Sequence, residues 1–133
     1  MFLILFTIVA LAIMCAIMFY PTGPQELFIL EKTDSKKDDY RCIVYTDGSI
    51  DYKEKTLKSK IKESDLDKIK SELSTLKKTP VQCTPDGPHD MEKWELTISD
   101  NNKKMVLDRG ASCEPKSSQP LEHIITIVSK YIN

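Results

Sequence analysis

The chain has 133 residues, of which 19 are basic and 20 acidic, and its formal net charge at pH 7 is −1. A nucleic-acid-binding domain normally carries a clustered basic excess, so this balance argues against a nucleic-acid partner. The charged part of the chain has a typical size for one domain and is too small for two.

The first twenty residues (MFLILFTIVALAIMCAIMFY) contain no charge, no proline and no glycine. As a helix rising about 1.5 Å per residue, they would span roughly 30 Å, the thickness of a bilayer's hydrocarbon core. This predicts a transmembrane anchor helix over residues 1–20, which makes the chain a single-pass membrane protein with a signal-anchor and the lipid bilayer as a partner. A cleaved signal peptide is the alternative, but no Lys or Arg precedes the apolar run. The side of the membrane that the domain faces is left open.

Residues 21–25 are predicted to be a short exit linker, because Pro21, Gly23 and Pro24 stop helix propagation. Residues 26–133 are predicted to form one soluble α+β domain. It begins at once, since the apolar residues 27–30 follow the linker directly.

The first half of the domain reads as a strand, a hairpin and a helix. Two extended segments, 41–45 and 49–52, flank Asp47-Gly48, which is a strong signal for a tight hairpin turn. A helix is predicted to open at Ser64, whose hydroxyl can cap it, and to end at Thr79-Pro80. Its apolar face consists of Leu66, Ile69, Leu73 and Leu76.

The second half repeats the order of hairpin and helix. Trp94, Leu96 and Ile98 alternate with polar residues, which predicts a strand with one buried face. Residues 100–102 form a turn, and residues 103–107 return as the partner strand. A last helix is predicted to start near residues 118–120, and its apolar face consists of Leu121, Ile124, Ile125, Val128 and Ile132. This hairpin–helix–hairpin–helix order predicts a small antiparallel sheet with two helices on one face.

Three cysteines lie beyond the first segment. Cys42 falls within a predicted strand and is expected to be a small buried apolar residue. Cys83 and Cys113 lie in loops that contain proline, so we expect them to form a disulfide if the domain faces an oxidising compartment, and to stay free if it does not.

No motif predicts a catalytic residue, a cofactor site or a metal site. Cys42, Cys83, His89 and Cys113 are zinc-ligand types, but no C-x-x-C spacing supports such a site. The histidines, His89 and His123, stand beside no nucleophile motif, so an enzyme of the Cys–His type is disfavoured.

Aromatic side chains are the remaining candidates for partner contact. Tyr40, Tyr45, Tyr52 and Trp94 lie on or beside the predicted strands. Tyrosine and tryptophan dominate binding hot spots, although alternate aromatics on strands also serve sheet packing.

The sequence therefore predicts a non-enzymatic, membrane-anchored structural or interaction protein. It would be an accessory subunit that docks its domain onto a larger membrane-associated assembly, either a membrane complex or the membrane–capsid layer of a virion. The alternative is a membrane-tethered or exported small ligand-binding or sensory domain, with a site formed by the loops at 83–90 and 109–115.

Overall fold

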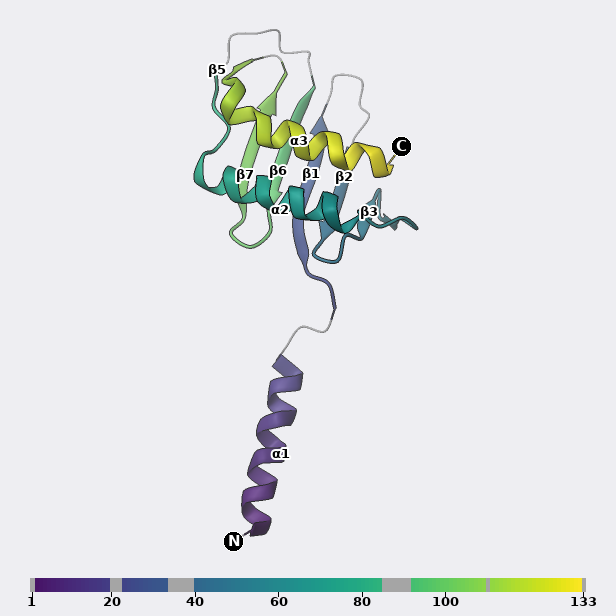
Figure 1. Ribbon diagram of the computed structural model, residues 1–133, viewed down its shortest axis with the longest axis vertical. Coiled ribbons are helices and arrows are strands. Elements are labelled where there is room, and N and C mark those ends of the chain that lie inside the picture. Colours follow the sequence, from purple (N-terminus) through teal and green to yellow (C-terminus); the bar gives the residue numbers. More distant parts are fainter. Residues whose placement is uncertain (1, 20–22, 34–39, 85–91, 110, 133) are drawn as a thin grey trace.

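The computed structural model describes residues 2–19, 23–33, 40–84, 92–109 and 111–132 (Figure 1). Its elements in chain order are α1 (Phe2–Phe19), β1 (Glu26–Thr33), β2 (Tyr40–Tyr45), β3 (Ile50–Tyr52), β4 (Lys55–Thr56), α2 (Glu63–Lys78), β5 (Cys83–Thr84), β6 (Lys93–Ile98), β7 (Lys103–Asp108), β8 (Ser112–Cys113) and α3 (Pro115–Ile132).

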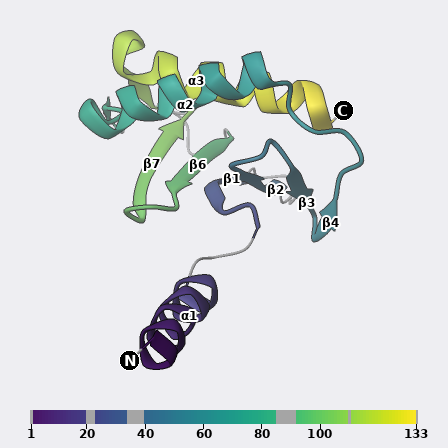
Figure 2. The ribbon, with the colours of Figure 1, turned by 60° about the horizontal axis from the view of Figure 1, so that its bottom comes forward.

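Six of the strands form one sheet, in the order β4-β3-β2-β1-β6-β7. Its pairings are antiparallel, and β1 lies in the middle between the hairpins β2–β3 and β6–β7. Helices α2 and α3 lie side by side over one face of this sheet (Figures 1 and 2). The expected α+β class and antiparallel sheet are confirmed, while β5 and β8 form a separate two-stranded ribbon.

The core lies between the sheet and the two helices. Alternate residues of β1 and β6 face it, so Phe28, Leu30 and Leu96 are fully buried. The four predicted apolar residues of α2 are also buried. Each such side chain contributes roughly 1.5–3 kcal/mol when it leaves water.

The hairpin turn at Asp47-Gly48 is confirmed. The Gly48 N–H donates to the Tyr45 carbonyl at 3.0 Å, and the Ser49 N–H donates to the Asp47 carboxylate at 3.0 Å. Gly48 has a φ of +88°, and a Cβ added there would lie 2.7 Å from the Ile61 carbonyl oxygen. Only glycine fits this turn without a shift of the backbone.

The start of α2 differs from the prediction, because Ser64 lies inside the helix and does not cap it. Lys62 is the N-cap residue and makes no side-chain capping bond. A tyrosine from α3 provides the partner instead: the Tyr131 hydroxyl accepts the Lys62 N–H at 3.1 Å and donates to Asp65 at 2.5 Å. A tertiary contact therefore replaces the local cap.

Helix α3 begins at Pro115, earlier than the predicted start near residues 118–120. Proline suits this first position, where an N–H would have no helical partner. The Ser117 hydroxyl fixes the first turn, because it donates to the Glu114 carbonyl at 2.9 Å and accepts the Gln82 N–H at 3.0 Å. Pro120 consequently lies within the helix, at the cost of one backbone hydrogen bond.

The predicted transmembrane helix is the main correction. The helix in this segment, α1, has 18 residues. Among the helices of the described residues, none combines the length and apolar character that crossing a membrane requires. The transmembrane anchor over residues 1–20, the signal-anchor and the single-pass membrane localisation are therefore wrong.

Candidate interaction surfaces

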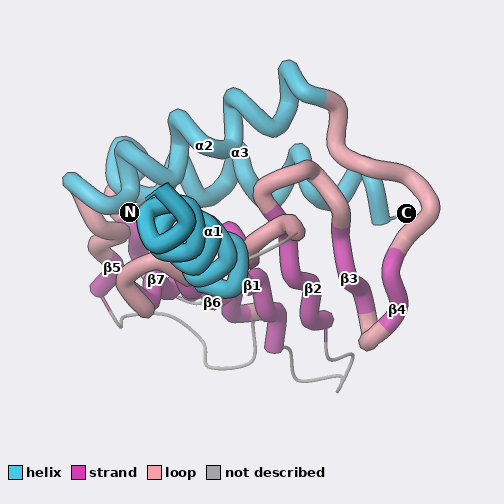
Figure 3. The backbone as a smooth tube through the Cα atoms, turned by 90° about the horizontal axis from the view of Figure 1, so that it is seen from below, coloured by secondary structure: helices cyan, strands magenta, loops and turns pink. Residues whose placement is uncertain are grey.

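Helix α1 presents the most exposed apolar surface of the described chain. Its described side chains, residues 3–15, are all exposed. The large ones range from 53% exposed at Val9 to 83% at Leu3. The Thr7 hydroxyl donates to carbonyls of its own helix, at 2.8 Å from Ile4 and 3.1 Å from Leu3, so it offers no free donor to a partner. The helix is apolar on every side and stands apart from the sheet and its helices (Figure 1). Figure 3 views it nearly along its axis.

Three of the four aromatic residues that the sequence suggested for partner contact lie together on the helix-covered face of the sheet. The Tyr40 ring centroid lies 5.2 Å from that of Tyr52 and 5.2 Å from that of Trp94. The Lys32 ammonium lies 5.6 Å from the Trp94 ring centroid. Trp94 is only 6% exposed, so nearly all of its surface is used within the domain. This cluster is mainly part of the core, and its role in partner contact stays a prediction.

Two polar groups beside this cluster are buried. The Tyr40 hydroxyl makes no hydrogen bond within the described residues, and burial, together with the nearby Cys42 thiol, raises its pKa far above the ordinary value. Burial likewise raises the pKa of the Cys42 thiol to about 12. Cys42 is fully buried and remains a neutral thiol at physiological pH, which is the environment of a structural cysteine.

Tyr45, the fourth aromatic residue, lies on the opposite face of the sheet. Its hydroxyl donates to Asp51 at 2.7 Å, and this bond raises the tyrosine pKa to about 12. The Thr56 hydroxyl donates to the other Asp51 oxygen at 2.7 Å. Both bonds favour the charged carboxylate, so the pKa of Asp51 is lowered. Asp51 thereby joins β2, β3 and β4 on the face that the helices leave open.

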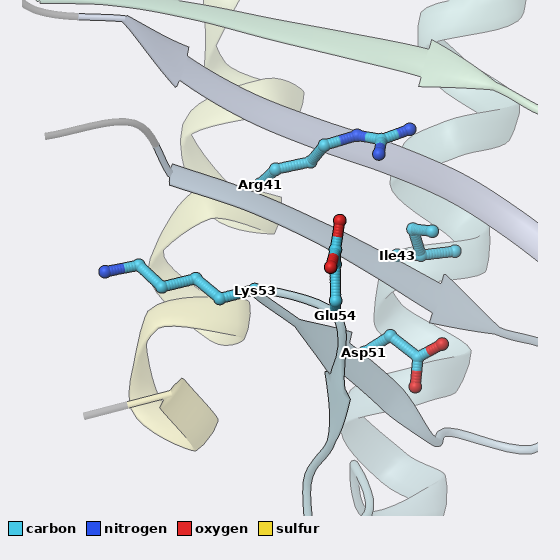
Figure 4. Close-up of a pocket in the computed structure, with 5 residues that line it drawn as sticks. All are labelled: Arg41, Ile43, Asp51, Lys53 and Glu54. Atoms are coloured by element: carbon cyan, nitrogen blue, oxygen red, sulfur yellow. The ribbon is translucent and has the colours of Figure 1, made fainter. Parts of the chain in front are cut away.

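A hollow of about 560 Å³ lies next to Asp51. It is lined by Arg41, Ile43, Asp51, Lys53 and Glu54. In the view of Figure 4 the Glu54 carboxylate lies below Arg41, with Lys53 on one side and Ile43 on the other. Lys53 and Glu54 form the turn between β3 and β4, with φ values of 49° and 65°. This left-handed backbone disfavours side chains of their size. Lys53 and Glu54, which carry opposite charges, therefore border the hollow from a strained turn.

The ribbon β5–β8 is closed by a disulfide between Cys83 and Cys113, the pair that the sequence suggested. Its sulfur atoms lie against the outer edge of the sheet. Cys83 Sγ is 3.9 Å from the Val106 carbonyl oxygen, and Cys113 Sγ is 3.6 Å from that of Asp108. The disulfide thus ties the ribbon beside strand β7.

The remaining chemical candidates are not brought together. His123 pairs with Glu72, with Nδ1 3.0 Å from the carboxylate oxygen, and so joins α3 to α2. His89 lies outside the described residues, as does most of the predicted 83–90 loop site. Within the described ranges, no group of three or more His, Cys, Asp or Glu could hold a metal ion.

Arg109 joins a charged cluster that the sequence did not suggest. Its guanidinium makes a bidentate pair with Glu122 on α3, and its Nε lies 3.3 Å from Glu92. The Trp94 indole also donates to Glu92 at 3.0 Å. This hydrogen bond and, to a smaller extent, the contact with Arg109 lower the pKa of the Glu92 carboxyl. The pKa of Arg109 is raised, chiefly by Glu122. These contacts fix the end of β7 against α3, and no local spacing in the sequence predicts them.

No protein-family model, curated protein sequence or solved structure matches this chain.

Proposed function

We propose that the chain is a structural or interaction protein without enzymatic activity, an accessory subunit whose helix α1 docks into the apolar interior of a larger protein assembly. The observation that carries this proposal is the exposure of α1. Its large apolar side chains are 53–83% exposed, and they surround the helix.

A helix that is apolar all round is stable in water only where something covers it. Patches of this kind on a single chain mark interaction sites. One flat partner surface would cover only one side of α1. We therefore expect the partner to be a group of apolar helices, or a groove of comparable depth, that encloses α1 while the α+β domain stays outside.

The test is co-purification of the full chain from its native source in mild detergent, followed by native mass spectrometry. We expect a protein partner in fixed stoichiometry. A Val9→Lys variant should lose it, because an ammonium group buried in apolar surroundings is strongly unfavourable. Ser74→Lys, at an exposed position of α2, is the matched control and should keep the partner.

Two results would contradict this proposal. The first is a partner that is retained equally by the Val9→Lys and Ser74→Lys variants. The second is a chain that floats with protein-free phospholipid vesicles and co-purifies with no protein in fixed ratio.

The hollow beside Asp51 favours a second candidate, a small ligand-binding domain. Its volume of about 560 Å³ lies within the usual range for ligand sites. The lining carries two positive side chains, Arg41 and Lys53, and two negative ones, Asp51 and Glu54. Charges of both signs suit a zwitterionic ligand such as a free amino acid. Amide chemical shifts in β2–β4, recorded during titration with amino acids, should move for the native chain and not for Arg41→Ala. Unchanged shifts at millimolar ligand would exclude this candidate.

A further inference from the structure

Helices α2 and α3 cover one face of the six-stranded sheet, and α1 lies beyond the end of the sheet (Figures 1 and 3). The other face, the open face, has no helix of the described chain over it. Its centre is partly apolar. Ile29 on β1 lies directly opposite Ile43 on β2 and Thr97 on β6, and each of these side chains is partly exposed. Uncovered sheet faces of this kind can pack against a second sheet.

The strand register places two rows of side chains across the open face. The first row runs from β3 to β7 and consists of Asp51, Ile43, Ile29, Thr97 and Lys104. It carries a negative charge at one end and a positive charge at the other, each two strands from β1. Because neighbouring strands are about 4.8 Å apart, the two charges lie roughly 10 Å from β1 on opposite sides.

The second row lies beside the first and consists of Arg41, Glu31, Glu95 and Val106. Here the positive charge is on β2 and a negative charge is on β6, the two neighbours of β1. Both rows therefore place opposite charges at equal distances from the central strand.

This arrangement makes the open face complementary to itself. If two copies stack their open faces with β1 over β1 and the two strands parallel, each side of one sheet meets the other side of the second. Asp51 then faces Lys104 of the second copy, and Arg41 faces Glu95 of the second copy. Two-fold symmetry makes each contact twice. Complementary charges of this kind fix the register of an interface.

Lys104 is free to make the contact with Asp51 of the second copy. Its ammonium lies 3.0 Å from Glu95 of its own chain, yet the side chain is 55% exposed. The hollow of about 560 Å³ beside Asp51 lies on the open face and would receive it (Figure 4). Asp51 accepts hydrogen bonds from two neutral hydroxyls and keeps its negative charge. A small ligand in the hollow and the second copy would therefore exclude each other.

The open face is large enough for a modest interface. Five strands about 4.8 Å apart and about six residues long cover roughly 500 Å². Two such faces bury about 1,000 Å², the lower limit for a specific complex. We therefore expect a reversible pair of chains rather than a permanent one.

We propose that the open face docks onto the same face of a second copy of this chain, so that the two sheets form a sandwich with α2 and α3 on both outer sides. Since the two β1 strands run in the same direction, both α1 helices leave the sandwich at the same end. They remain available to the partner proposed above. The pairing does not use α1, so either proposal can fail without the other.

The test is the mass of the full chain in non-ionic detergent, measured by sedimentation velocity up to millimolar concentration. We expect an equilibrium between monomer and dimer. Asp51→Lys and Lys104→Asp each place like charges opposite each other and should weaken the pairing at least tenfold. An equal mixture of the two variants should pair again, because every lysine at these contacts then faces an aspartate.

Lys68→Asp is the matched control for the charge reversals. Lys68 is exposed on α2, which covers the other face of the sheet. This variant should pair as the native chain does.

Glu31→Gln keeps the test decisive if a charge reversal fails to fold. The Glu31 side chains of the two copies face each other across the symmetry axis, and like charges oppose the pairing. Their removal should tighten the pairing at least threefold, which a loss of folding could not do.

Four results would each overturn the proposal. They are a chain that stays monomeric at millimolar concentration, a dimer unaffected by Lys104→Asp, a mixture of the two folded reversals that does not pair, and a dimer that Glu31→Gln does not tighten.

Discussion

Tyr131 and Asp65 are 66 positions apart in sequence and share a hydrogen bond of 2.5 Å. The same hydroxyl accepts the Lys62 N–H, so the end of α3 caps the start of α2. We expect Tyr131→Phe to lower the free energy of unfolding by about 1–2 kcal/mol, the usual worth of a helix cap. Urea unfolding measures the loss. Amide exchange in residues 63–66 should become faster, whereas Tyr45→Phe, whose hydroxyl contacts no helix, should leave these amides unchanged. Equal exchange in both variants would refute the cap.

The disulfide closes a loop between positions 30 residues apart. Removing it with Cys83→Ser/Cys113→Ser should cost about 2–4 kcal/mol, because the unfolded chain regains the entropy that the cross-link removed. The measurement is the urea midpoint, with Cys15→Ser as the control that leaves the disulfide intact. If the midpoints of the two variants coincide, the cross-link does not stabilise the domain.

Gly48 is the more crowded of the two glycines that the structure describes. Gly48→Ala combines a φ of +88° with a Cβ only 2.7 Å from the Ile61 carbonyl oxygen. We expect a loss of about 2 kcal/mol or more, since both strain and a backbone clash oppose the alanine. Gly23→Ala is the comparison, because Gly23 also has a positive φ but its added Cβ meets nothing within 4 Å. Thermal unfolding should separate the two, and similar losses would show that the contact with Ile61 is unimportant.

The Asp47 carboxylate makes the hairpin turn sensitive to acid. Hydrogen bonds from Ser49, with Lys60 nearby, lower its pKa from 3.8 to about 2. A lowered pKa in the folded state contributes stability that is present above the unfolded value and is lost as the pH falls toward the folded value. The stability difference between the native chain and Asp47→Asn should therefore be full above pH 4 and shrink between pH 4 and pH 2. Urea unfolding at several pH values tests this, and a difference independent of pH would contradict it.

The parts of the fold that follow from local patterns could be predicted. Two local patterns predicted burial of one face: the alternation of Trp94, Leu96 and Ile98 in a strand, and the helical spacing of the leucines in α2. Both faces are buried in the structure. The Asp47-Gly48 turn is equally local, because its bonds join residues within four positions.

The helix starts and the charged cluster could not be predicted, because distant residues determine them. Ser64 looks like a cap, but Tyr131 takes that role from the other end of the domain. Arg109 meets Glu122 only once α3 lies across the sheet. The apolar N-terminal segment suggested a membrane span, whereas among the described residues no helix is both long and apolar enough to cross a membrane.

The central claim is that α1 is enclosed by a protein partner, and the Cys15 thiol on α1 reports this directly. Cys15 is exposed, Cys42 is buried, and Cys83 and Cys113 are bonded, so a maleimide should label Cys15 first in the folded chain. The measurement is the labelling rate in the co-purified complex and in the isolated chain, in the same detergent. Enclosure of α1 predicts labelling at least tenfold slower in the complex. Equal rates would show that the partner does not cover α1, and would contradict the proposed function.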